Sequence, residues 1–95
     1  MAVARVYHMA ARETLGDALA VALHDLKKEL RANTDCSEVY WFRDLENRHR
    51  FLFIEIWDSS EAHKASNGKI GGDVLAHIAA ACIEMPEGSY EEVLH

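Results

Sequence analysis

The sequence is poor in the residues that mark metal and disulfide proteins. It has only two cysteines, Cys36 and Cys82, and they lie too far apart for a CxxC motif. No two histidines have the HxxxH or HExxH spacing of a zinc site. We therefore expect no metal, and both cysteines should behave as small buried hydrophobes in a reducing compartment.

Long apolar runs and basic clusters are also lacking. No run approaches the ~20 apolar residues of a membrane span, and the N-terminus shows no secretory signal. Ten basic residues are scattered among sixteen acidic ones, for a formal net charge of −6. Phosphate backbones are bound by clustered Lys and Arg instead. These features predict a soluble cytoplasmic protein that binds neither nucleic acid nor membrane.

Apolar side chains, by contrast, are plentiful. They make up 49 % of the 95 residues and include two Trp, three Tyr and three Phe. A chain this short buries only about 60–65 % of its unfolded surface, so its own core does not use all of them. We expect a second copy to cover the remainder in a homodimer.

The spacing of apolar residues predicts one domain, residues 1–95, with four strands and two helical regions. Strand-forming residues are concentrated at 2–10, 36–44, 51–57 and 89–95. A first helix is indicated by leucines at helical spacing: Leu15, Leu19, Leu23, Leu26 and Leu30. The second helical region begins after Ser59 and is interrupted by the glycine-rich segment 67–73. This β-α-β-β-α-β order is that of the ferredoxin-like α+β fold, an antiparallel sheet with its helices on one face.

The strand at 51–57, FLFIEIW, carries one carboxylate among apolar residues. Side chains alternate between the faces of a strand, which gives two sets: Leu52, Ile54 and Ile56, and Phe51, Phe53, Glu55 and Trp57. We expect the aliphatic set to pack under the helices and the aromatic set to lie on the helix-free face. A solvated sheet face would be polar, so an apolar one predicts a dimer interface or a ligand pocket.

Glu55 allows two interpretations. We expect Val39 to lie opposite it in the hairpin, because the alternative register sets Glu38 against Glu55 and opposes two carboxylates. The expected register also brings Arg43 to the same face. Glu55 is then either an acid–base or substrate-orienting group with a raised pKa, or a structural charge paired with Arg5 or Arg43. We favour the structural interpretation.

The segment EIWDSSEA (55–62) resembles the motif of the antibiotic biosynthesis monooxygenase (ABM) family, whose members are dimeric α/β barrels. In that family an apolar strand ends in Glu-x-Trp and is followed by a polar turn and an alanine-containing helix. The matching residues are Glu55, Ile56, Trp57, Asp58, Ser59 and Ala62, and Cys36 and Arg43 fit the preceding strand. The length of the chain and the order of its elements are also similar.

The resemblance implies a dimer joined through helix-free sheet faces, with a cavity between sheet and helices in each subunit. Several members oxidise phenols, anthrones or quinols with O2 and without metal or flavin, and others cleave haem. Nine residues after the motif Trp, where the family commonly has His or Trp, this chain has Ser66, and its first strand offers Tyr7 and His8 in place of Asn. These departures disfavour haem cleavage, although His77 lies near the expected histidine.

On this resemblance, the sequence predicts a cofactor-independent monooxygenase acting on a small quinol- or anthrone-like aromatic. The catalytic candidates are His8, His77 and Trp57, and His63 is a further histidine able to approach the cavity. The candidates for substrate binding are Phe53, Glu55, Tyr40 and Arg43. The alternative function is a non-catalytic dimeric small-molecule-binding or stress protein of the same fold, and haem degradation is a third.

Overall fold

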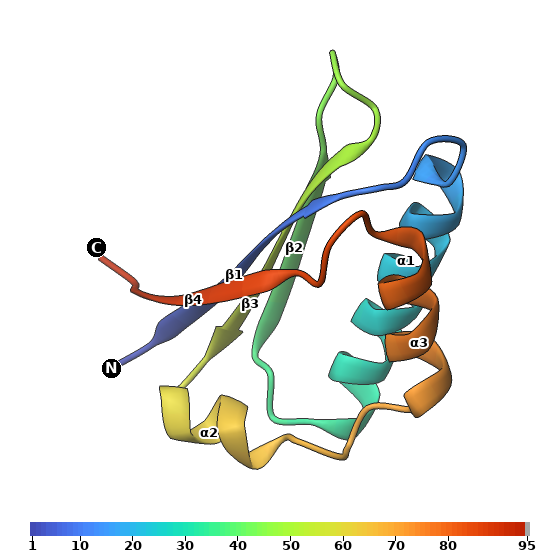
Figure 1. Ribbon diagram of the computed structural model, residues 1–95. Helices are drawn as coiled ribbons and strands as arrows, with labels where there is room; N and C mark the ends of the chain where they lie inside the picture. Colours follow the sequence, from blue (N-terminus) through green and yellow to red (C-terminus); the bar gives the residue numbers. More distant parts are fainter. Residues whose placement is uncertain (95) are drawn as a thin grey trace.

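The computed structural model describes residues 1–94 and contains four strands and three helices (Figure 1). The strands are β1 (Val3–Ala10), β2 (Glu38–Arg43), β3 (Arg50–Trp57) and β4 (Glu87–Glu92). The helices are α1 (Gly16–Asn33), α2 (Ser60–Ala65) and α3 (Gly72–Ala81). The last strand begins two residues earlier than expected and ends at Glu92; His95 lies outside the described residues.

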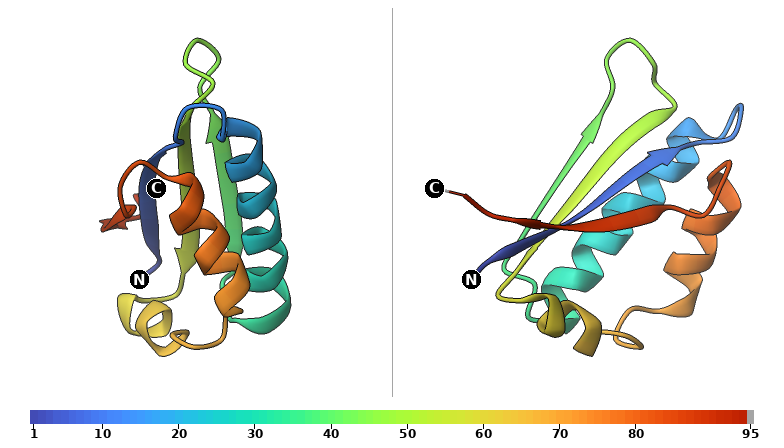
Figure 2. Two further views of the ribbon diagram at one scale, coloured as in Figure 1. Left: turned by 45° about the vertical axis from the view of Figure 1, so that its right-hand side comes forward. Right: turned by 60° about the vertical axis from the view of Figure 1, so that its left-hand side comes forward.

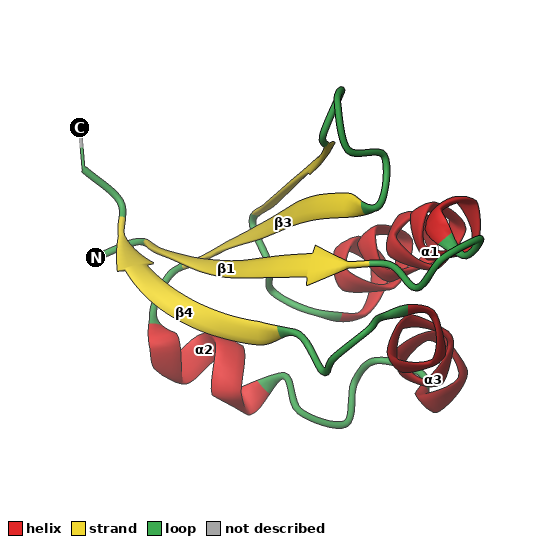
Figure 3. Ribbon diagram, turned by 45° about the horizontal axis from the view of Figure 1, so that its top comes forward, coloured by secondary structure: helices red, strands yellow, loops and turns green. Residues whose placement is uncertain are grey.

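The sheet has the expected ferredoxin-like topology. Its strands lie in the order β2-β3-β1-β4, and each neighbouring pair is antiparallel (Figure 3). In the hairpin, Val39 lies opposite Glu55, which confirms the register expected from the sequence. On the other side of β3, Arg5 of β1 is the partner of Glu55, and Tyr7 is the partner of Phe53.

α1 and α3 pack side by side over one face of the sheet (Figure 2). α1 buries the expected leucine stripe, in which Leu19, Leu23, Leu26 and Leu30 are all nearly inaccessible. α3 contributes Val74, Ile78 and Ala81 to the same core. α2 contacts β1 and β3 at the end of the sheet where β3 finishes. The sheet and helices thus enclose a core with a short helix at one end.

The second helical region is divided as the sequence predicts. The hydroxyl of Ser59 accepts a hydrogen bond from the Ala62 N–H at 3.0 Å and starts α2. The segment 66–71 then separates α2 from α3, and its Gly68 has a φ of +86°, a conformation that favours glycine. At the far end of this segment, the Gly71 N–H donates to the Glu29 carboxylate of α1 at 2.7 Å. The loop is therefore fixed to the helix layer at its α3 end.

The two faces of β3 are the reverse of what we expected. Phe51, Phe53, Glu55 and Trp57 are at most 4 % exposed and point toward the helices. The aliphatic set, Leu52, Ile54 and Ile56, is partly exposed on the helix-free face. Alternation separates the two sets but does not say which lies inside when both are apolar. The larger aromatic side chains are the ones that fill the space between the sheet and the helices.

The helix-free face is nevertheless apolar, as expected. Besides the aliphatic side chains of β3, it carries Tyr40 and Phe42 of β2, which are 50 % and 53 % exposed. A contiguous apolar sheet face of this kind marks an interaction surface. Cys36 and Cys82 are both free and buried, which confirms their expected role as small hydrophobes.

Candidate functional site

A cavity of about 290 Å³ lies between the sheet and the helix layer. Most of its wall is apolar and comes from α1, α3, the end of β1, the loop before α3 and the segment before β4. The apolar residues of the wall are Met9, Leu26, Leu30, Ile70, Leu75, Ile78, Ala79, Met85 and Pro86. Asn67 and Gly68 of the loop after α2 complete the rim. The volume and lining suit a small, largely apolar ligand.

The polar groups of this cavity gather at one end. Tyr7 of β1, Glu55 of β3, and His63 and Ser66 of the α2 region line it. The register sets Tyr7 and Glu55 on the same face of neighbouring strands. Only two residues separate the end of β3 from the start of α2, and this short connection brings His63 back over them. The Ser66 hydroxyl donates to the His63 carbonyl at 2.6 Å. Three separate elements thus place their polar side chains at one point.

Glu55 is held by its neighbour two residues along the strand. The indole Nε1–H of Trp57 donates to Glu55 Oε1 at 3.0 Å. Neither Arg5 nor Arg43 forms an ion pair with Glu55 in the part of the chain described, so the structural interpretation that we favoured lacks its expected partner. Among the same residues, Glu55 Oε1 accepts only this bond and Oε2 accepts none, so both oxygens keep lone pairs available to a ligand.

The buried position changes the acidity of Glu55. Burial, which penalises the carboxylate, raises the pKa of Glu55 from 4.5 to about 7, against the opposing effects of the Trp57 hydrogen bond and the positive charge of Arg5. Near neutral pH the group is therefore divided between its acid and base forms. A carboxylate with a pKa close to the working pH is suited to general acid–base chemistry.

His63 faces Glu55 from α2. Its Nε2 lies 3.9 Å from Glu55 Oε1 and 3.4 Å from the Tyr7 hydroxyl, and its Nδ1 lies 2.6 Å from the Tyr90 hydroxyl. Burial first, and then the charges of Arg5 and Lys64, lower the pKa of His63 below 6.5. At neutral pH the imidazole is therefore uncharged, and its contact with Glu55 is not an ion pair.

Arg5 supports this cluster from the side away from the cavity. Its Nε donates to the Tyr7 hydroxyl at 3.2 Å, and its guanidinium lies 4.3 Å from the centre of the Tyr90 ring. Gly88 on β4 makes room for it, because a Cβ at that position would lie 2.5 Å from Arg5 Cζ. Burial raises the pKa of Tyr7 above 10, so its hydroxyl keeps its proton at neutral pH.

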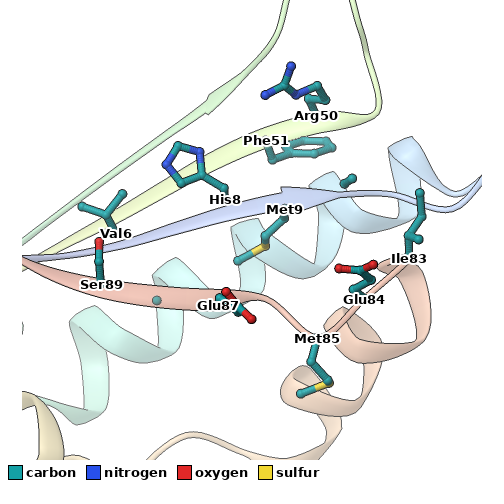
Figure 4. A pocket seen from close by; sticks show the side chains of 12 residues that line it. Val6, His8, Met9, Arg50, Phe51, Ile83, Glu84, Met85, Glu87 and Ser89 are labelled. Atoms are coloured by element: carbon teal, nitrogen blue, oxygen red, sulfur yellow. The ribbon is translucent and has the colours of Figure 1, made fainter.

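A second, larger hollow of about 630 Å³ lies where β1 and β4 diverge (Figure 4). Figure 4 shows His8 and Met9 projecting from opposite sides of β1. The ionisable groups of this hollow, among them His8, Arg50 and Glu84, are exposed to solvent. Because these groups are solvated whereas Glu55 is buried, we place the candidate functional site at Glu55.

The structure brings together only part of the set chosen from the sequence. Glu55, Trp57 and Phe53 lie at or behind the polar end of the cavity, whereas His8 and Tyr40 lie on the opposite face of the sheet. His77 is exposed on α3, in a groove between α1 and α3. Arg43 is at the far end of the hairpin, where its Nη1 donates to Asp17 at 2.9 Å.

Three residues of the cluster carried little weight in the sequence. Tyr7 was noted only as a departure from the family pattern, and Arg5 only as a charge partner for Glu55. For Tyr90 the sequence indicated mainly a packing role. Alternation along the first strand places Arg5 and Tyr7 on one face, and the sheet order then brings both to Glu55. The place of Tyr90 in the cluster follows only from the pairing of β4 with β1, which sets Tyr90 opposite Arg5.

Among residues 1–94, no three His, Cys, Asp or Glu side chains are grouped so as to hold a metal ion. Within the same residues, none of the helices has the length and apolar character needed to cross a membrane.

Several solved structures share this fold. A Chloroflexus aurantiacus protein named for the antibiotic biosynthesis monooxygenases is 21 % identical with a TM-score of 0.80, the match covering 100 % of this chain and 95 % of that one. A Bordetella bronchiseptica protein of the same family name is 10 % identical with a TM-score of 0.85, covering 99 % and 98 %. SnoaB from Streptomyces nogalater, a cofactor-independent oxygenase, is 10 % identical with a TM-score of 0.80, covering 99 % and 94 %. At these identities the likeness establishes the fold.

No protein of curated function matches the sequence significantly. The sequence model of one family does match, over residues 2–70, which is more than half of the chain and includes β1, β3, α2 and the polar end of the cavity. The chain therefore belongs to the antibiotic biosynthesis monooxygenase family.

Proposed function

We propose that this protein is a cofactor-independent monooxygenase that oxidises a small hydroxylated aromatic molecule in the cavity between sheet and helices. The observation that carries the proposal is the buried Glu55, a carboxyl with its pKa raised to about 7 at the only strongly polar end of an otherwise apolar cavity in residues 1–94. Family membership supports a monooxygenase-like function. SnoaB, which shares this fold, is a cofactor-independent oxygenase, and this supports the proposal.

Glu55 would act as the base. The O–H bond of a quinol or of the enol form of an anthrone breaks, and its proton passes to the Glu55 carboxylate. The electron-rich anion gives electrons to O2, and a carbon–oxygen bond forms to give a peroxide anion, which takes the proton back from Glu55 and becomes a hydroperoxide. The C–H bond on the same carbon then gives its proton to the Glu55 carboxylate while the O–O bond breaks, which leaves a new carbonyl. The departing hydroxide takes this proton from Glu55 and leaves as water. One oxygen atom enters the product and the other becomes water.

Oxygen uptake with a panel of hydroxyarenes of one to three rings tests the function. We expect enzyme-dependent uptake, above the rate without protein, and a product that has gained one oxygen and lost two hydrogens. With 18O2, one labelled atom should appear in the product. Saturable binding without any uptake across the panel would contradict the proposal and favour the non-catalytic binding protein.

The pH dependence of turnover should follow Glu55. Because the base must be ionised, kcat/KM is expected to rise between about pH 6 and 8 with a midpoint near the Glu55 pKa of about 7. The measurement is initial oxygen uptake at low substrate concentration, using a substrate that does not itself titrate in this range. A profile that is flat across this interval would remove Glu55 as the base.

Ala79→Leu is expected to block the cavity without touching its polar end. Ala79 of α3 lines the wall, and overpacking a filled site costs about 1–3 kcal/mol, so ligand binding should weaken by about tenfold or more. Ala76→Leu is the matched control, because Ala76 lies on the same helix and is exposed. Equal KM values for the two variants would show that the substrate lies elsewhere.

We also propose that the protein acts as a homodimer joined through the helix-free sheet face. The support is the apolar face itself: Tyr40 and Phe42 are half exposed, and Ile54 at the centre of the sheet is only partly covered in a single chain. Monomeric proteins rarely leave a contiguous apolar surface of this kind uncovered. The functional cavity lies on the opposite side of the sheet, so each subunit would keep its own site.

A further inference from the structure

We propose that Tyr90 fixes His63 in the tautomer that carries its hydrogen on Nε2. His63 then acts as the hydrogen-bond donor, and Glu55 as the acceptor, for a single hydroxyl oxygen of the ligand. The inference rests on the proposed function, since it assigns roles within the same site. Tyr90 is a positioning residue in this scheme, because it touches His63 and does not line the cavity.

The first argument is the short contact on the Nδ1 side. The Tyr90 hydroxyl and His63 Nδ1 are 2.6 Å apart. Hydrogen bonds donated by hydroxyl groups are typically about 2.7–2.8 Å long, whereas those donated by N–H are about 2.9–3.0 Å. The distance therefore favours Tyr90 O–H as the donor and an unprotonated Nδ1 as the acceptor. In a neutral imidazole the hydrogen is then on Nε2.

The second argument comes from the groups around Nε2. Glu55 Oε1 lies 3.9 Å away, and the Tyr7 hydroxyl lies 3.4 Å away. An N–H directed at these oxygens is attracted by the carboxylate, whereas a bare nitrogen lone pair facing it would be repelled. The Tyr7 oxygen already accepts from Arg5 Nε at 3.2 Å and has capacity for a second donor.

The opposite network is chemically possible but fits less well. It would have Nδ1–H donate to Tyr90, and Tyr7 donate to a bare Nε2 across the longer distance of 3.4 Å. The 2.6 Å bond to Tyr90 would then be donated by the imidazole N–H, which is a weaker donor than a phenol hydroxyl. The lone pair of Nε2 would face the carboxyl of Glu55, whose side chain is only 5 % exposed. Both contacts are better satisfied with the hydrogen on Nε2.

Tyr90 is itself held in place. The Arg5 guanidinium lies against its ring at 4.3 Å, and the Lys64 ammonium lies 5.6 Å from the same ring centre. Its ring also meets the His63 ring edge-on, with the centres 5.4 Å apart. Fixing the ring fixes the direction of its hydroxyl, so the orientation of His63 depends on the edge strand β4.

The remaining gap defines what the ligand presents. Glu55 Oε1 and His63 Nε2, 3.9 Å apart, are close enough for one oxygen atom to lie about 2.8 Å from both. A neutral hydroxyl meets both needs, because it donates its hydrogen to Glu55 and accepts from His63 Nε2–H. When its proton moves to Glu55, the resulting oxyanion keeps the His63 hydrogen bond. The site therefore selects neutral phenols or enols and rejects ligands that present a carboxylate to Glu55.

Nitrogen NMR of protein labelled with 15N-histidine tests the tautomer directly. The His63 signals are assigned by their loss in His63→Gln, and His24→Gln serves as a control that removes an exposed imidazole. We expect wild-type His63 to show the Nε2–H tautomer and Tyr90→Phe to shift it toward a mixture. An Nδ1–H tautomer in the wild type, or an unchanged spectrum in Tyr90→Phe, would overturn the proposal.

Binding of 2-naphthol under anaerobic conditions tests the ligand assignment without relying on turnover. At pH 7 we expect wild type to bind 2-naphthol, to bind 2-naphthoate at least about tenfold more weakly, and to lose roughly tenfold in 2-naphthol affinity in both Tyr90→Phe and His63→Gln. Equal binding of the two ligands, no binding of 2-naphthol, or unchanged affinity in both variants contradicts it. A lack of oxygen uptake would overturn the proposed function alone, because neither experiment uses oxygen.

Discussion

Glu55→Gln is expected to give a protein that is more stable than the wild type above pH 7 but inactive in oxygen uptake. Gln keeps the shape of the protonated acid and an oxygen that accepts the Trp57 indole hydrogen bond. It lacks the charge that burial penalises and the basicity that the reaction needs. Loss of a general base typically lowers the rate by 10²–10⁴-fold, so we expect turnover to fall by at least about 100-fold.

The sign of the stability change follows from the pKa of Glu55. The folded-state value is raised from 4.5 to about 7, so between these two pH values the folded protein holds a proton that the unfolded chain releases. Wild-type stability therefore falls as pH rises through this interval, by on the order of 3 kcal/mol. Gln does not titrate and escapes this loss.

Thermal unfolding at pH 4.5, 6 and 8 measures the difference. At pH 8 we expect the midpoint of Glu55→Gln to lie about 10 °C or more above that of wild type, and at pH 4.5 the two should nearly coincide. Glu13→Gln, which removes an exposed carboxylate in the turn between β1 and α1, is the matched control. Protein concentration must be equal throughout, because the proposed dimerisation would shift the midpoint. A Glu55→Gln variant that is less stable than wild type at pH 8 would contradict the burial penalty.

Ile54→Lys is expected to convert the proposed dimer into a folded monomer. Ile54 lies on β3, next to the centre of the sheet, and points to the helix-free face. In a symmetric dimer the interface would contain one buried ammonium group from each subunit. Burying an unpaired charge costs several kcal/mol. We expect the dissociation constant to rise by at least about 1000-fold.

Sedimentation at micromolar concentration distinguishes the two states. Val21→Lys is the control, since Val21 is 63 % exposed on the outer side of α1, within the helix layer. Far-ultraviolet circular dichroism should be unchanged in both variants, because neither residue is buried within one chain. A wild-type protein that sediments as a monomer, or an Ile54→Lys protein that still sediments as a dimer, would show that this sheet face is not the interface.

The order of elements and the hairpin register were accessible from sequence because they depend on local patterns. Leucine spacing predicts α1, alternating strands predict the sheet, and the unfavourable pairing of Glu38 with Glu55 selects the register that the structure has. Which face of β3 turns toward the helices depends instead on how the side chains of all strands and helices together fill the core. Phe53 and Trp57 are both buried under the helices, and no local pattern in β3 indicates this.

Part of the candidate site could be predicted for the same reason. Glu55 stands out as a charge in an apolar strand, although the sequence favoured a structural role for it. Its partners come from β1, α2 and β4, so they are set by the tertiary arrangement of the strands. His63 illustrates the limit: it lies one helical turn before Ser66, the position where the resemblance leads one to look for a histidine. Only the path of α2 shows that His63 reaches Glu55.

The polar end of the cavity and its α3 wall belong to different parts of the chain. Tyr7, Glu55 and His63 lie within the residues that match the family model, whereas the wall residues of α3 lie beyond them. α3 packs mainly on α1 and joins α2 through the loop at 66–71. Leu75 and Ala79 line the cavity from this helix and are not part of the buried core, so they can change in size without disturbing the strands that hold Glu55. On the proposed function, the choice of molecule would therefore be separate from the reaction performed on it, and a descendant could take new substrates while keeping the same chemistry.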